Sequence, residues 1–75
     1  MDLNISERHP GTQQIMKHFA YDHLPPHLQA ISGQAWHLAV QMVAALPDGP
    51  ELTAGLRKLL EAKDCFVRAA LDAKG

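Results

Sequence analysis

The chain has 75 residues, enough for one small domain, and its single cysteine rules out an internal disulfide. Hydrophobic residues make up 47% and charged residues 20%, which is typical of a folded chain and excludes a disordered one. The net charge of −1 argues against a DNA-, RNA- or acidic-membrane-binding protein. A domain this small, without disulfides, has association with other copies as its remaining source of stability. We therefore expect self-association.

The beginning of the chain predicts a loop and then a short helix. Residues 1–11 include Pro10 and Gly11 and are expected to be a flexible N-terminal segment, with residues 12–75 forming the helical domain. Thr12 could N-cap a short helix that carries Ile15, Met16 and Phe19. Residues 1–4 have neither the basic start nor the apolar middle of a signal peptide, so we expect a cytoplasmic protein.

Two proline-containing breaks divide the rest of the chain into two longer helices. The first break is Leu24-Pro25-Pro26 and the second is Pro47-Asp48-Gly49-Pro50. Apolar residues follow the first break in steps of three and four, at Leu28, Ile31, Ala35, Leu38, Met42 and Leu46. The same pattern follows the second break, at Leu52, Leu56, Leu59, Leu60, Phe66, Val67, Ala70 and Leu71. The sequence predicts an all-α fold, a short N-terminal helix with an antiparallel two-helix hairpin, assembling into a homo-oligomer.

A second apolar flank lies beside the main stripe of the first long helix. It consists of Trp36, Val40 and Val43. The flank is either part of a wide core face or a face for another subunit. A two-helix unit seldom covers both flanks by itself, which favours the subunit face.

Lys63 is the most unusual charged residue, because it falls in the middle of the apolar face of the last helix. A buried ammonium without a partner is costly. Three interpretations remain open: a side chain whose charge reaches the rim, a buried ion pair with Asp22 or another carboxylate, or a contact with an anionic ligand between helices or subunits.

The other cations of this helix have two interpretations. Arg57 has Glu61 four residues later, and Arg68 has Asp64 four residues earlier, so exposed ion pairs are the default expectation. Where symmetry brings copies of an arginine together, its guanidinium could instead bind phosphate oxygens.

Two aromatic residues offer stacking surfaces. Tyr21 either covers the open end of the hairpin or stacks on a base, and Trp36 is either a base platform or an interface anchor. His23 and His27 are separated by Pro25 and Pro26 and are therefore not helical neighbours. The histidines show no metal-ligand spacing, so we expect no metal site, and His23 is interpreted as a turn or ligand contact.

No pattern in the chain indicates catalysis. There is no glycine-rich phosphate loop, no nucleophile elbow and no inward pair of carboxylates. Cys65 lies opposite the main apolar stripe, near Glu61, which is a poor setting for a thiolate. We expect a binding protein and not an enzyme, without a cofactor.

Part of the chain resembles a family of small phage proteins. The residues are Phe19-Ala-Tyr21-Asp-His23-Leu24-Pro25-Pro26-His-Leu28-Gln29-Ala-Ile31-Ser32, Leu56–Asp64 and Val67–Ala70. They are similar to the helical-hairpin domain of anti-CBASS sponge proteins, which is shared with anti-Thoeris sponges. The resemblance implies dimers that assemble into hexamers and trap cyclic di- or trinucleotide messengers without cleaving them. It also implies a tyrosine that stacks on a base, matched here by Tyr21, and basic side chains that meet symmetric trinucleotides, matched by Arg68.

One family feature is missing from the chain. The phosphate-binding lysine of the family falls near Trp36, and no lysine occurs between Lys17 and Lys58. The dinucleotide pocket then depends on Lys63 or Arg57 for its positive charge. The alternative function is a small oligomeric helical adaptor whose apolar stripe binds a protein partner.

Overall fold

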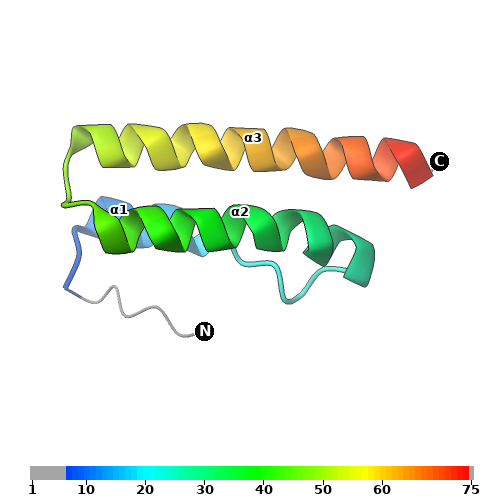
Figure 1. Ribbon diagram of the computed structural model, residues 1–75, viewed down its shortest axis with the longest axis horizontal. Coiled ribbons are helices and arrows are strands. Elements are labelled where there is room, and N and C mark those ends of the chain that lie inside the picture. Colours follow the sequence, from blue (N-terminus) through cyan, green and yellow to red (C-terminus); the bar gives the residue numbers. More distant parts are fainter. Residues whose placement is uncertain (1–6, 75) are drawn as a thin grey trace.

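The structure is a computed structural model that describes residues 7–74. Over these residues it contains three helices and no strand: α1 (Pro10–Lys17), α2 (Pro26–Ala45) and α3 (Pro50–Lys74). Helices α2 and α3 lie side by side and antiparallel, and α1 lies behind them in the view of Figure 1. This confirms the predicted all-α fold with a short first helix and a helical hairpin.

Prolines define the ends of the helices. Pro10, Pro26 and Pro50 each occupy the first helical position, where the missing N–H is not needed and the fixed φ suits the helix. Helix α2 ends because Pro47 disfavours helical geometry at the preceding residue, Leu46, which is extended with φ −121° and ψ 147°. The short connection that follows turns the chain back along α2.

The first helix begins earlier than the sequence analysis expected. Its N-cap is His9, whose Nδ1 accepts a hydrogen bond of 2.9 Å from the Gly11 N–H, so the expected N-cap at Thr12 is wrong. The Thr12 side chain instead lies inside α1 and is fully buried. Pro10 and Gly11 are therefore helical and not part of a loop. Residues 1–6 of the expected flexible segment lie outside the described residues.

The core forms where α1 covers the end of the hairpin that carries the turn. Helix α1 packs against α3, and Phe19, just after α1, has no exposed surface. Val40 and Val43 of α2 are buried in this cluster, and Trp36 packs against it. The second apolar flank of α2 is thus a core face within one protomer. Its interpretation as a subunit face is wrong for Val40 and Val43, because α1 and Phe19 cover it.

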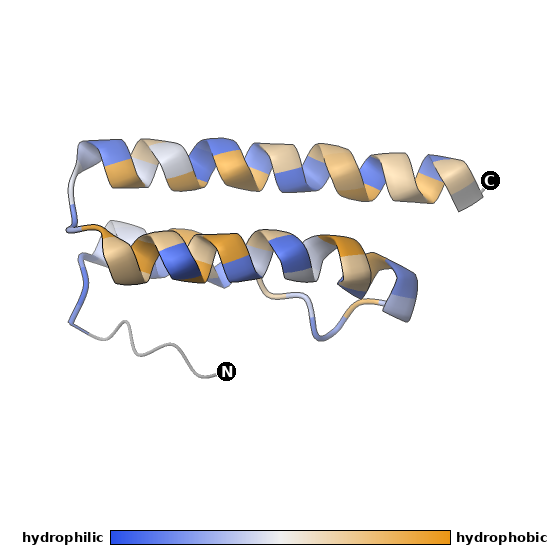
Figure 2. Ribbon diagram, in the orientation of Figure 1, coloured by the Kyte–Doolittle hydropathy of each residue, from blue (hydrophilic) through white to orange (hydrophobic). Residues whose placement is uncertain are grey.

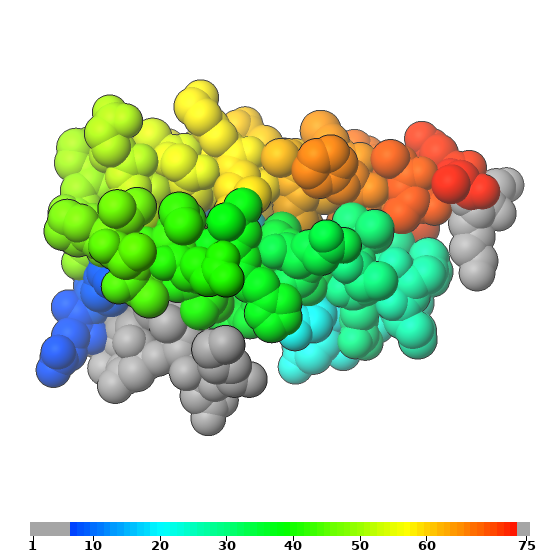
Figure 3. All heavy atoms as spheres, in the orientation of Figure 1, coloured from blue at the N-terminus to red at the C-terminus, as the bar shows by residue number. Residues whose placement is uncertain are grey.

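The half of the main apolar stripe of α2 that leads to the turn stays exposed. Leu38, Met42 and Leu46 are 43%, 37% and 44% exposed, and Phe66 on α3 is 60% exposed. Figure 2 shows the apolar positions of α3 lying mostly along the edge that faces α2. The two long helices therefore meet along an apolar boundary that α1 does not cover, on the face turned to the viewer in Figure 3.

Candidate functional site

Tyr21 lies in the segment between α1 and α2 and packs on the side of α2. Its half-buried ring rests on Gly33, where an added Cβ would lie only 3.3 Å from the ring atom Cε2. The ring centroids of Trp36 and His37 lie 6.5 and 6.4 Å away, tilted by 48° and 54°. These three side chains form an aromatic cluster, Tyr21–Trp36–His37, which glycine makes possible by leaving room for the ring.

Of the other ring-bearing residues predicted to bind a ligand, Trp36 lies beside Tyr21 and His23 does not contact it. Trp36 belongs to the aromatic cluster and is partly buried against the core. His23 is exposed two residues after Tyr21, and the structure gives it no hydrogen bond or ring contact. Sequence reasoning did not single out His37 as a neighbour of Tyr21. Its spacing of four residues from Gly33 could have indicated that the two share one side of α2.

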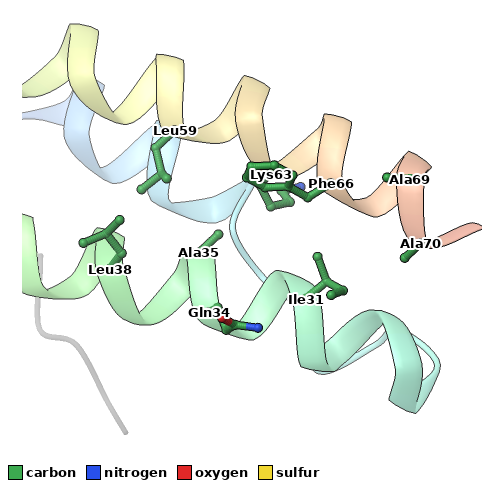
Figure 4. Close-up of a pocket in the computed structure, with 9 residues that line it drawn as sticks. All are labelled: Ile31, Gln34, Ala35, Leu38, Leu59, Lys63, Phe66, Ala69 and Ala70. Carbon is green, nitrogen blue, oxygen red and sulfur yellow. The ribbon is translucent and has the colours of Figure 1, made fainter.

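Lys63 lies in an apolar groove between α2 and α3. The groove has a volume of about 620 Å³, and Figure 4 shows its lining side chains facing one another across the two helices. The Lys63 side chain is 14% exposed, and its Nζ lies 2.9 Å from Asp64 Oδ1. The Lys63 ammonium therefore has a carboxylate partner within the protomer, and this partner is Asp64 and not Asp22.

The structure separates Tyr21 from Lys63 within one protomer. The Lys63 groove is bounded on α2 by Ile31, Ala35 and Leu38, whereas Tyr21 rests on Gly33 and the aromatic residues one turn later. At about 100° per residue these two sets lie on nearly opposite sides of α2. The Tyr21 ring and the Lys63 ammonium therefore do not line one common site within a single protomer.

Arg57 and Arg68 do not form the expected ion pairs. Among the described residues, Arg57 is not within ion-pair distance of Glu61, and Arg68 is not within ion-pair distance of Asp64. Asp64 pairs with Lys63 instead. Both arginines are exposed, and the Arg68 guanidinium contacts Cys65 Sγ at 3.3 Å. Helical geometry places both on the side of α3 that faces away from the groove.

A polar cluster that the sequence analysis did not identify joins the N-terminal segment to the turn between α2 and α3. Asp48 accepts hydrogen bonds from Arg8 Nε at 3.0 Å, the His9 N–H at 3.0 Å and Thr12 Oγ1 at 3.1 Å. Arg8 also donates to the Val43 and Leu46 carbonyls. At the end of α2 such carbonyls have no N–H of a following helical turn to accept from, and Arg8 replaces it. We call these groups the Asp48 clamp.

The clamp has an electrostatic consequence. The backbone hydrogen bond from His9 holds the pKa of Asp48 below its ordinary value of 3.8, and the side chains of Arg8 and Thr12 act in the same direction. Partial desolvation opposes them. Asp48 therefore stays ionised where it closes the N-terminal segment onto the turn. Its hydrogen bonds give it a structural role, because they join the N-terminal segment to the turn.

The remaining groups give no sign of a metal or membrane site. Among the residues that the structure describes, no three His, Cys, Asp or Glu side chains gather so that they could hold a metal ion. None of the three described helices combines the length and apolar character needed to cross a bilayer. Comparison with protein-family models, with curated proteins and with solved structures found no match for this chain.

Proposed function

We propose that this protein is a sponge that binds cyclic di- or trinucleotide second messengers and holds them without cleaving them. The proposal extends the resemblance of Phe19–Ser32 and the two matching segments of the last helix to anti-CBASS sponges. Within it, the chain is phage-encoded, acts in the cytoplasm of the infected cell and works as a homohexamer.

The observation that carries the proposal is the placement of Tyr21. The ring is half-buried, held flat on Gly33 and flanked by Trp36 and His37, so part of it stays accessible while its position is fixed. A ring held in this way loses little conformational freedom when a base stacks on it. Stacking of a base on an aromatic side chain contributes about 1–3 kcal/mol and tolerates any base.

The phosphates need positive charge, which the site cations predicted from the sequence must supply. Arg57, Lys63 and Arg68 all lie on α3, and Lys63 faces the opposite side of α2 from Tyr21. In the proposed assembly, these cations come from a neighbouring protomer. Arg57 and Arg68 both suit this role, because both are exposed and neither pairs with a carboxylate among the described residues.

The test is isothermal titration of the purified protein with a panel of cyclic di- and trinucleotides. We expect binding with fewer than one ligand per chain, and recovery of intact ligand after heat denaturation. Tyr21→Ala should weaken binding by about 5- to 150-fold, which corresponds to the loss of one stacked base. Tyr21→Phe keeps the ring and is the matched control.

Two outcomes would overturn the proposal. The first is a flat titration with every nucleotide together with an unchanged melting temperature. The second is recovery of a linearised product, which would make the protein an enzyme. Melting curves of the ligand-free variants check that Tyr21→Ala still folds.

The alternative function, an adaptor that binds a helix of another protein, is favoured by the open apolar boundary between α2 and α3. Leu38, Met42 and Phe66 all lie there and are 37% to 60% exposed. An amphipathic helix laid along this boundary would complete a four-helix arrangement. A stoichiometric protein partner, combined with no response to cyclic nucleotides, would support the adaptor in place of the sponge.

A further inference from the structure

The geometry points to a phosphate-binding site in the hollow between the start of α1 and the start of α3, formed by His9, Thr53 and Arg57. We call it the Arg57 hollow. It has a volume of about 550 Å³ and lies at the end of the hairpin that carries the turn (Figure 1). Small-molecule sites typically measure about 300–1,000 Å³. The site goes beyond the proposed function, since its lining belongs to a single protomer and does not include Tyr21.

Helix α3 supplies two hydrogen-bond donors to the Arg57 hollow. Thr53 and Arg57 are four residues apart and therefore lie one turn apart on the same side of the helix. Among the described residues, the Thr53 hydroxyl has no hydrogen-bond partner and Arg57 has no carboxylate partner. The planar guanidinium can donate to two oxygens of one phosphate, and the hydroxyl can donate to a third.

His9 supplies a donor from the other side of the hollow. Its backbone N–H donates to Asp48 Oδ2 at 3.0 Å, and its Nδ1 accepts from the Gly11 N–H at 2.9 Å. Because Nδ1 is the acceptor, the proton of the neutral ring is on Nε2. Within the described residues this Nε2–H has no partner, so the ring offers it to the hollow that it lines.

The charges around the hollow favour an anion. Asp48 also lines it, but Oδ1 accepts from Arg8 and Thr12 and Oδ2 accepts from His9, and the Arg8 guanidinium balances the negative charge. Among the lining side chains, Arg57 is then the charge without a partner. Donors that come from two separate elements suit the tetrahedral oxygens of a phosphate better than the two coplanar oxygens of a carboxylate.

The experiment is a nuclear magnetic resonance titration with two probes, inorganic phosphate and dimethyl phosphate, at about pH 7.5, where an ordinary histidine is neutral. Sodium chloride at matched ionic strength is the reference. We expect saturable shifts of the Thr53 and Ala54 amides and the His9 ring, with dissociation constants in the millimolar range. Tighter binding of inorganic phosphate would identify a free or terminal phosphate as the ligand, and equal binding would identify a phosphodiester.

Neighbouring cations of α3 provide a matched pair of variants. Arg57→Gln should weaken phosphate binding at least about tenfold, because it removes a charge-assisted contact. Lys58→Gln removes the same charge from an exposed residue that does not line the hollow, so binding should stay within about twofold of the wild type. His9→Asn keeps a side-chain acceptor at the N-cap but removes the Nε2–H, and should weaken binding about threefold or more. Melting curves check that each variant folds.

Two results would overturn the site. One is a wild type whose shifts do not saturate or match those in sodium chloride. The other is a Lys58→Gln variant that loses as much affinity as Arg57→Gln, which would show a general response to charge. Saturable phosphate binding combined with a flat titration by cyclic nucleotides would keep this site while removing the proposed sponge function.

Discussion

Replacing Gly33 and Gly55 separately by alanine tests how Tyr21 is held on α2. Both glycines lie inside long helices, where alanine is favoured by about 0.5–1 kcal/mol. Their surroundings differ. An added Cβ at Gly55 meets nothing within 4 Å, whereas at Gly33 it lies 3.3 Å from Tyr21 Cε2 and 3.6 Å from Cδ2 and Cζ. The pair therefore compares the same substitution with and without a ring in the way.

The expected magnitudes follow from these contacts. Gly55→Ala should gain the full helix preference, which raises the melting temperature by roughly 2–8 °C for a domain of this size. In Gly33→Ala the ring must move outward by a few tenths of an ångström, against its packing on Trp36 and His37. We expect this strain to cancel the gain, so the two variants should differ in unfolding free energy by about 1 kcal/mol.

The assay is thermal and urea denaturation followed by circular dichroism, at one low protein concentration. Near-ultraviolet signals report the environment of Tyr21 and Trp36. If Gly33→Ala stabilised the protein as much as Gly55→Ala, the close packing of Tyr21 on Gly33 would be refuted. The same pair tests the proposed function, because a displaced ring should weaken cyclic-nucleotide binding in Gly33→Ala alone.

Three further substitutions test other parts of the structure. The pKa of Asp48 is lowered in the folded state, so its stabilising effect is present above the unfolded value of 3.8 and is lost as the pH falls through the lower folded value. Asp48→Asn should therefore lower the melting temperature most at neutral pH, and its difference from the wild type should shrink as the pH falls below 3.8. A difference that does not change with pH would contradict the clamp. Ser32 Oγ is buried and makes no hydrogen bond within the described residues. Ser32→Ala should therefore raise the unfolding free energy, measured by urea denaturation, by up to about 1 kcal/mol. A lower unfolding free energy in this variant would show that the hydroxyl has a partner. Lys63→Met keeps the packed methylene groups and removes the charge. We expect unchanged or higher stability, because Asp64, the partner of Lys63 in the ion pair, is half-exposed to water. A large loss of stability would show that the ion pair stabilises the fold.

The fold was largely predictable because its signals are local. Two proline-containing breaks and apolar residues in steps of three and four identified the hairpin without tertiary information. The start of α1 was placed too late, because Thr12 resembles an N-cap while its hydroxyl is used by Asp48 instead. The flank with Val40 and Val43 was assigned outward, because nothing in α2 itself shows that α1 and Phe19 cover it.

The candidate site was less predictable, because its contacts are not local. Arg8 meets Asp48 forty positions later in the chain, and an arginine in a polar segment carries no signal of a distant partner. The periodicity did place Lys63 within the apolar face, but it could not tell which carboxylate pairs with it. The place of Lys63 on the apolar face could thus be predicted from the sequence, whereas the partners of Lys63 and Arg8 required the structure.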